Sequence, residues 1–165
     1  MHWHNHLERL RTVATVYLTK PELTPQDREE IRNEVCRFEK LYQERYGALS
    51  PRQRANLTRA YQIAVDVGIG LECPADALMA WGVHTGLIDE MLDDWHVIER
   101  LLFDYDGDHE DLDKYIRELY YGFFDINDKQ ALPFIDTASF KGELECRGYC
   151  FAPSLDGTVY HVFND

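Results

Sequence analysis

The sequence of 165 residues is poor in cysteine and in basic side chains, and it has no long hydrophobic run. Its 4 cysteines are too widely spaced for the disulfide framework of a small secreted domain. No apolar run approaches the roughly 20 residues of a membrane-spanning helix, and no charged and apolar leader with a cleavage site begins the chain. We therefore expect a cytoplasmic protein that has no transmembrane segment.

Sequence motifs for catalysis and metal binding are also missing. The chain has no glycine-rich phosphate loop, no nucleophile elbow and no paired metal ligands. A calcium loop starting at Asp104 would need glycine at its sixth position and glutamate at its twelfth, but His109 and Tyr115 stand there. We predict no catalytic residue, no bound metal and no cofactor, and we expect that the protein is not an enzyme. A hydrolase that uses paired carboxylates is the least favoured alternative.

Acidic residues outnumber basic ones by 30 to 17, and the excess lies in the second half of the chain. Residues 1–71 hold 11 Lys and Arg and 9 Asp and Glu, a net charge of +2, whereas residues 72–165 hold 6 and 21, a net charge of −15. Such a field attracts a basic partner and disfavours direct binding of nucleic acid or of an anionic membrane. The composition is 45% hydrophobic and 13% aromatic, which indicates a folded protein and not a disordered acidic tail.

The acidic residues are densest between Asp89 and Glu118. In a helix, Asp89 would stand one turn before Asp93 and Glu90 one turn before Asp94, and such like-charge pairs destabilise a helix by about 0.2–0.5 kcal/mol each. Apolar residues recur at helical spacing through the same stretch, so a buried stripe is expected beneath an anionic surface. The candidate partner-binding residues are Asp89, Glu90, Asp93, Asp94, Glu99, Asp104, Asp106, Asp108, Glu110, Asp111, Asp113 and Glu118.

Two interpretations of this acidity compete. One is a solvated face whose acids favour the positive end of a helix dipole. The other is a surface that imitates the phosphates of nucleic acid. B-DNA carries one charge about every 3.4 Å per strand, and carboxylates four residues apart on a helix lie roughly 6 Å apart, so the two spacings are of the same order.

Helices are predicted for most of the chain. Thr24 and Ser50 each precede a proline, and a hydroxyl cap followed by proline is a strong helix start, so we predict helices over residues 25–46 and 51–67. A further helix is expected over residues 7–18.

The second half predicts shorter elements. Residues 74–84 and 133–145 have the pattern of short helices, and Asp108 is expected to cap a third helix after a turn over residues 105–108. Two β-rich runs, 149–152 and 158–163, are joined by an Asp-Gly pair that is typical of an antiparallel hairpin. An isolated hairpin is only marginally stable, so we expect it to pack on the helices or to find a further strand. The predicted core of this region consists of Phe140, Leu144, Tyr149, Val159 and Phe163, packed on a helix that carries Tyr115 and Leu119.

Four segments of the last third resemble one known family. The run LDKYIREL (112–119), the run PFIDTASFKGEL (133–144), the pair Gly148-Tyr149 and the run GTVYHVF (157–163) resemble the C-terminal domain of ArdA antirestriction proteins. The resemblance implies a protein that is similar to bent B-form DNA in charge and shape and that occupies the DNA groove of type I restriction-modification enzymes. By the same resemblance, Asp136 would belong to a packing element between helix and hairpin and would not be catalytic. The first half lacks the opening module that is usual in this family.

We therefore predict a mainly helical α+β fold with a small C-terminal antiparallel hairpin or sheet. Residues 1–71 would form a near-neutral helical region, and residues 72–165 an acidic domain like the C-terminal domain of ArdA. The expected function is inhibition of a bacterial defence enzyme by DNA mimicry, either antirestriction or anti-CRISPR, in the host cytoplasm. The partner would be a basic DNA-binding groove, and the sequence leaves a homodimer open. The contrasting hypothesis is an acidic adaptor that binds a basic protein.

Overall fold

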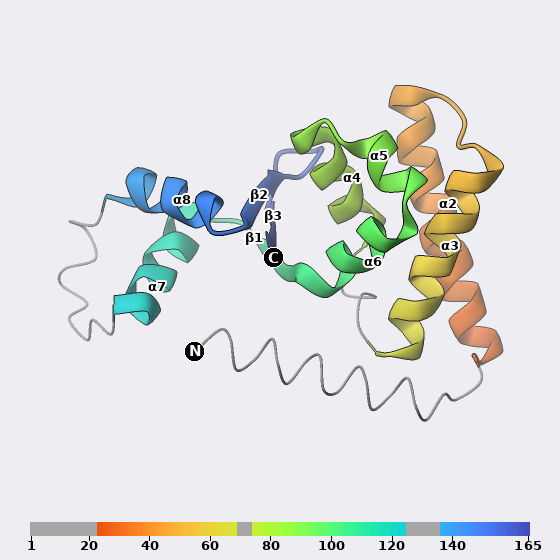
Figure 1. Ribbon diagram of the computed structural model, residues 1–165, viewed down its shortest axis with the longest axis horizontal. Coiled ribbons are helices and arrows are strands. Elements are labelled where there is room, and N and C mark those ends of the chain that lie inside the picture. The colour runs from red at the N-terminus through yellow and green to blue at the C-terminus, as the bar shows by residue number, and fades with distance from the viewer. Residues whose placement is uncertain (1–22, 69–73, 125–135) are drawn as a thin grey trace. The chain divides into compact units, whose positions relative to one another are not determined.

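The computed structural model describes residues 23–68, 74–124 and 136–165, and it divides the chain into two compact units (Figure 1). The first unit is Met1–Phe103 and the second is Asp104–Asp165. The helix predicted over residues 7–18 lies outside the described residues. The boundary between the units in the sequence lies about thirty residues after the change in charge composition near residue 71. The charge composition and the compact units therefore divide the chain at different points.

The described part of the first unit is helical. Its elements are α2 (Pro25–Tyr46), α3 (Pro51–Asp66), α4 (Ala75–Thr85), α5 (Ile88–Asp93) and α6 (Trp95–Asp104), whose last residue begins the second unit. The two predicted helix starts are confirmed, because Thr24 and Ser50 each form a reciprocal capping box with the residue three positions later. The Thr24 hydroxyl accepts from the Asp27 N–H at 3.1 Å, and the Ser50 hydroxyl accepts from the Gln53 N–H at 3.1 Å.

The core of the first unit brings all its described helices together. Phe38 of α2, Leu57 of α3, Leu78 of α4, Leu92 of α5 and Ile98 of α6 are each fully buried. The α4 helix has a glycine, Gly82, at the point where it meets α5. A Cβ atom at that position would lie 2.9 Å from the Ile88 side chain, so the two helices approach closely only because the side chain is absent.

The acidic stretch is not one continuous helix. It breaks at Asp94, whose backbone is extended at φ −124° and ψ 102°, and α6 begins immediately afterwards. The Asp94 carboxylate accepts from the His96 N–H at 3.0 Å and so satisfies a backbone donor at the start of α6. The prediction that Glu90 and Asp94 stand one turn apart on a single helix is therefore wrong.

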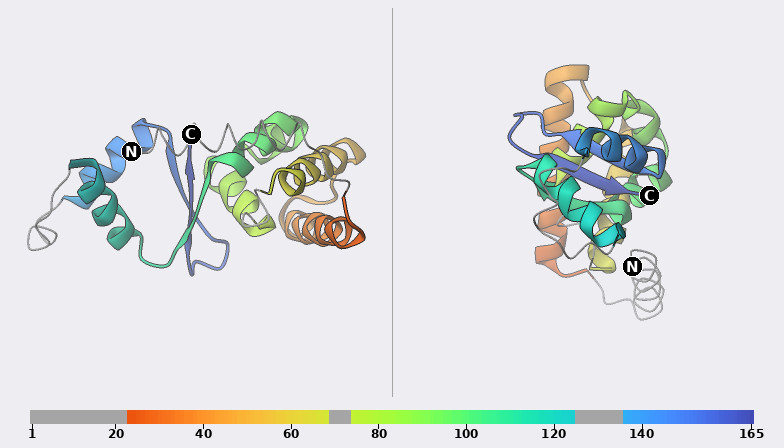
Figure 2. Two further views of the ribbon diagram at one scale, coloured as in Figure 1. Left: turned by 90° about the horizontal axis from the view of Figure 1, so that it is seen from below. Right: turned by 90° about the vertical axis from the view of Figure 1, so that its left-hand side faces the viewer.

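The second unit is a small antiparallel sheet with two helices on one side (Figure 2). Its elements are β1 (Tyr105–His109), α7 (Leu112–Phe124), α8 (Thr137–Cys146), β2 (Tyr149–Pro153) and β3 (Tyr160–Asn164). The strand order is β1-β3-β2, with β3 in the centre. The mainly helical α+β fold and the predicted hairpin between β2 and β3 are both confirmed.

The strand β1 occupies a segment that the sequence predicts to be a turn. Residues Tyr105–His109 pair with β3, and the register is interrupted between Tyr105 and Asp108, next to Gly107 at φ +100°. A glycine at positive φ is typical of a turn, but here it lies in a β-bulge within a strand. The hairpin thus gains the further strand that its stability requires.

The predicted core of the second unit is only partly correct. Phe140, Leu144 and Tyr149 do lie in one buried cluster, together with Ile116, Phe151 and Val162. Phe163 is also buried, but it pairs with Tyr105 of β1 across the sheet and lies on the opposite face from Val162. Val159 precedes β3. Side chains alternate along a strand, and the prediction chose the face of Val159 and Phe163, whereas Tyr160 and Val162 face this cluster.

Asp136 lies at the start of α8. Its carboxylate accepts from the Ser139 N–H at 3.1 Å and from the Ser139 hydroxyl at 2.8 Å, which makes it the N-cap of the helix. The helix that the sequence predicts from residue 133 begins at Thr137 in the described part, and residues 133–135 lie outside it.

Candidate partner-binding surface

The twelve candidate acids divide between the two units. Asp89, Glu90, Asp93, Asp94 and Glu99 belong to the first unit, and the other seven belong to the second. Nine of the twelve side chains are exposed. The exceptions are Glu99 and Asp106, which are half-buried, and Asp104, which is 7% exposed. Asp104 therefore cannot face a partner's groove.

Two exposed acids of α5 contact side chains of neighbouring helices. Asp89 accepts a hydrogen bond from the Tyr42 hydroxyl at 2.8 Å, and burial together with this bond raises the pKa of Tyr42 to about 12. The carbonyl of Asp93 accepts from Asn56 at 3.2 Å and from Arg52 at 3.3 Å. The Asp93 carboxylate lies 3.5 Å from the Gln53 amide nitrogen. Both acids thus help to hold α5 in place.

Glu99 does not fit the role of a phosphate mimic. It lies on α6, and its Oε2 atom is buried with no hydrogen-bond partner among the described residues. Burial raises the pKa of Glu99, and the charges of His96 and Arg59 oppose that rise. Arg59 itself lies over the Trp95 ring at 3.7 Å. A raised pKa favours the neutral, protonated form of the carboxyl group, whereas a phosphate of nucleic acid stays charged.

Two acids of the second unit, Asp106 and Asp113, also have internal partners. Asp106 accepts from the Tyr115 hydroxyl at 2.8 Å, and burial, together with the Asp106 charge, raises the pKa of Tyr115. Asp113 accepts from the Thr137 hydroxyl at 2.6 Å and from the Arg117 Nε at 2.7 Å, and these bonds, that of Thr137 first, lower the pKa of Asp113.

The cap of α7 is Asp111 and not the predicted Asp108. The Asp111 carboxylate accepts from the Lys114 N–H at 3.0 Å, and its carbonyl accepts from the Tyr115 N–H at 3.1 Å. Asp108 lies instead in β1, opposite His161. The sequence offered two aspartates before the helix, and the extension of the strand to His109 decides between them.

Four acids remain that are exposed and whose side chains have no hydrogen bond or ion pair with any described residue. They are Glu90, Asp108, Glu110 and Glu118, which we call the free acids. Six others, which we call the engaged acids, each make a hydrogen bond within the chain: Asp89, Asp93, Asp94, Asp106, Asp111 and Asp113. The sequence could not separate these two groups. Asp89 and Asp93 have partners in distant segments, and the caps Asp94 and Asp111 depend on where α6 and α7 begin.

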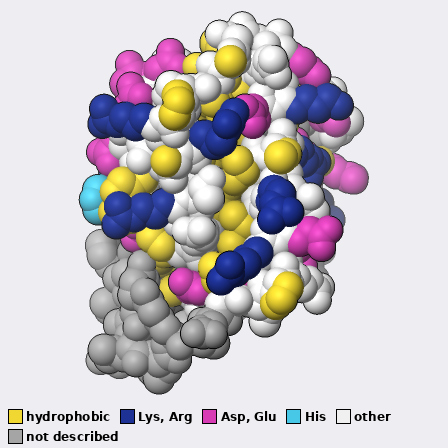
Figure 3. Space-filling view, turned by 90° about the vertical axis from the view of Figure 1, so that its right-hand side faces the viewer, with side chains coloured by type: hydrophobic (Ala, Val, Ile, Leu, Met, Phe, Trp, Pro, Cys, Tyr) yellow, Lys and Arg dark blue, Asp and Glu magenta, His cyan; other side chains and the backbone are white. Residues whose placement is uncertain are grey.

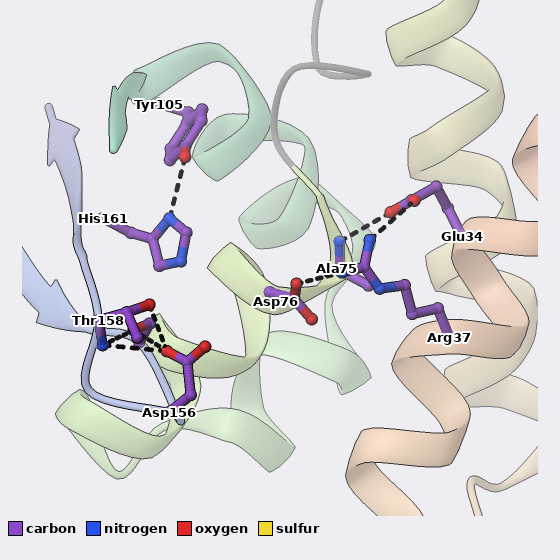
Figure 4. A network of polar contacts seen from close by, with 9 residues as sticks. Glu34, Arg37, Ala75, Asp76, Tyr105, Asp156, Thr158 and His161 are labelled. Carbon is purple, nitrogen blue, oxygen red and sulfur yellow. Dashed lines mark hydrogen bonds and ion pairs between the residues drawn. The ribbon is translucent and has the colours of Figure 1, made fainter. Parts of the chain in front are cut away.

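Acids outside the stretch show how readily carboxylates serve structure in this chain (Figure 4). In the first unit, Glu34 of α2 accepts from the Ala75 N–H at 2.7 Å, and Arg37 pairs with Asp76. In the second unit, Asp156 accepts from the Ser154 hydroxyl at 2.6 Å and from the Thr158 hydroxyl at 2.7 Å. These hydrogen bonds lower the pKa of Asp156 to about 2.

The described residues offer few groups for other chemistry. They include no group of three or more possible metal ligands among His, Cys, Asp and Glu. Burial and the charge of Glu145 raise the pKa of Cys150 to about 11, which keeps this thiol protonated near neutral pH. His161 is 3% exposed, and its Nδ1 lies 2.9 Å from the Tyr105 hydroxyl (Figure 4). Within the described ranges, no helix is long and apolar enough to cross a membrane.

Charge is distributed unequally between the two units. The second unit carries 14 acidic and 5 basic side chains, a net charge of −9 over 62 residues. The first carries 16 and 12, a net charge of −4 over 103 residues. The second unit therefore has the larger negative net charge, and it also holds three of the four free acids.

No protein-family model, no curated protein and no solved structure that was compared with the chain matches it. The resemblance to ArdA proteins thus depends only on the sequence segments described above, and it stays a prediction.

Proposed function

We propose that the protein is a DNA mimic that inhibits a bacterial DNA-binding defence enzyme. The partner would be the basic DNA-binding groove of a restriction-modification or CRISPR complex. The observation that carries the proposal is the set of free acids, which stay exposed and uncompensated while six neighbouring carboxylates are engaged within the chain. None of the four side chains bonds to a described residue, so their charge is available to a partner.

The second unit is the part that best fits a basic groove. Three free acids lie here: Asp108 in the strand β1, Glu110 in the connection between β1 and α7, and Glu118 in α7, which packs on the sheet. Their backbones are therefore held by the fold, so little conformational entropy is lost when they meet a partner. Charge complementarity of this kind accelerates association and selects a basic partner.

The test is competition with DNA for a purified type I restriction-modification enzyme and for a CRISPR effector complex. The variant Glu90→Gln/Asp108→Asn/Glu110→Gln/Glu118→Gln removes the four free acids. The control Glu29→Gln/Glu44→Gln/Glu143→Gln/Asp165→Asn removes the same number of exposed charges elsewhere. We expect competition by the first variant to weaken by about tenfold or more at matched ionic strength, because each exposed charge contact contributes roughly 0.2–1 kcal/mol.

Folding of both variants is checked by circular dichroism before competition is compared. Equal loss of competition in the variant and the control would show that only net charge matters and would remove the defined surface from the account. Absence of competition by the wild type against both enzyme classes would favour an acidic adaptor that binds another basic protein.

A further inference from the structure

The outer face of α2 and α3 has a character opposite to that of the second unit. Figure 3 shows Lys and Arg side chains gathered over these two helices, with an apolar strip between them. The two helices together carry 8 basic and 7 acidic side chains, in a protein whose net charge is −13. All eight basic side chains are exposed, among them Arg28, Arg32, Lys40, Arg52, Arg54 and Arg59.

Three of these six are free to meet a partner. Arg54 pairs with Glu39, the Arg52 guanidinium donates to the Asp93 carbonyl, and Arg59 lies over Trp95. By contrast, the side chains of Arg28, Arg32 and Lys40 make no ion pair or hydrogen bond with a described residue.

The free basic residues lie along one side of α2. Arg28, Arg32, Cys36 and Lys40 follow one another at intervals of four residues, and all four are exposed. Three acids of the same helix cannot neutralise them, since they already have partners. Asp27 is held in the capping box of α2, Glu34 binds the Ala75 N–H, and Glu39 pairs with Arg54.

The apolar component of the face distinguishes between classes of partner. Tyr46 is 46% exposed, and Cys36 and Ala55 are also exposed on the two helices. Nucleic-acid interfaces are polar and strongly positive, whereas arginine and tyrosine around an apolar centre are typical of protein interfaces. A protein segment with carboxylates beside an apolar stripe fits this face better.

We propose that the outer face of α2 and α3 binds an acidic amphipathic helix of a partner protein. The carboxylates of that helix would pair with Arg28, Arg32 and Lys40, and its apolar stripe would cover Cys36 and Ala55. This surface belongs to the first unit and is independent of the free acids. The protein then has two interaction surfaces of opposite sign, and the proposal does not depend on the function proposed above.

The experiment measures binding of a fluorescent amphipathic helical peptide, with glutamates flanking a leucine and alanine stripe, to the full chain by anisotropy. Its matched peptide replaces each glutamate with lysine. The test variant is Arg28→Glu/Arg32→Glu/Lys40→Glu, and the control Arg100→Glu/Lys114→Glu/Arg147→Glu makes the same change at three exposed basic residues elsewhere. We expect the acidic peptide to bind the wild type and the control. Binding to the test variant should weaken by about tenfold or more.

A second variant, Arg28→Gln/Arg32→Gln/Lys40→Gln, should show the same direction of change with a smaller effect, which guards against a folding defect in the charge-reversed chain. Three results would overturn the proposal: no binding of the acidic peptide at low ionic strength, equal binding by test variant and control, or stronger binding of the lysine peptide. Duplex DNA that binds through the same three residues more tightly than the peptide would assign the face to nucleic acid instead. Sedimentation of the wild type as a dimer that these substitutions dissociate would make the occupant a second copy.

Discussion

The two units use the same acidic residue types in different ways. In the first unit, α5, α6 and the residue between them hold five of the candidate acids, and only Glu90 is exposed without an internal partner. In the second unit, three of seven candidates are free in this sense, namely Asp108, Glu110 and Glu118. The difference arises because Tyr42, Gln53 and the start of α6 bond to Asp89, Asp93 and Asp94, whereas no described residue bonds to the side chains of those three acids of the second unit. Exposure alone therefore does not identify a partner-binding carboxylate.

The largest expected effect separates the stability of the two units. Phe140 is 7% exposed in the core of the second unit, and Phe140→Ala should destabilise that unit by about 3–5 kcal/mol because it leaves a cavity. Hydrogen exchange should then rise over residues 136–165 while residues 23–68 stay protected.

A change below about 1 kcal/mol in a denaturant titration would contradict the packing of Phe140. Equal loss of protection in both units would show that they unfold as one cooperative body.

The next effect sharpens the comparison of free acids. The variant Asp108→Asn/Glu110→Gln/Glu118→Gln should account for most of the roughly tenfold loss of competition that the four-residue variant shows. Glu90→Gln alone should change competition by at most about fivefold, since one exposed charge contributes about 0.2–1 kcal/mol. Inhibition constants measured at one ionic strength check both statements. A larger effect from Glu90 would move the partner-binding surface to the first unit.

A smaller effect concerns the start of α7. Asp111→Ala should lower the free energy of unfolding by about 1 kcal/mol because it removes the N-cap. Asp108→Ala should destabilise the protein less, because the Asp108 side chain has no described partner. Thermal unfolding of the two single variants gives the comparison, and a greater loss for Asp108 would restore it as the cap.

The smallest effect is a dependence on pH. The pKa of Asp156 is about 2 in the fold, below its ordinary value of 3.8, so its ionised form stabilises the folded state. That contribution is complete above about pH 4 and is lost as the pH falls toward 2. The stability difference between the wild type and Asp156→Asn should therefore be largest near neutral pH and shrink on acidification. A difference that is constant from pH 7 to pH 2 would contradict the hydrogen bonds to Ser154 and Thr158.

Local sequence patterns predicted much of the fold and less of the site. Capped helix starts at Thr24 and Ser50 and the Asp-Gly turn of the hairpin depend on neighbouring residues, so they can be recognised in the sequence. The strand β1 could not, because Gly107 at a bulge has the same local pattern as a turn. The partner of Asp89 is Tyr42, 47 residues away, and that of Asp113 includes Thr137, 24 residues away. A local sequence pattern does not predict hydrogen bonds between residues so far apart in the chain.

The most direct test of the central claim compares the free acids with the engaged acids. It measures, in the same samples, the free energy of unfolding and the competition with DNA for a defence enzyme. For Glu90→Gln/Asp108→Asn/Glu110→Gln/Glu118→Gln we expect unchanged stability, since these side chains have no described partner, with competition weakened by about tenfold or more. For Asp94→Ala/Asp111→Ala/Asp113→Ala, which removes two helix caps and the bonds of Asp113, we expect lower stability, with most of the competition retained per folded molecule. Loss of competition that follows stability in both variants, or no loss in the first, would contradict the claim that the free acids replace phosphates.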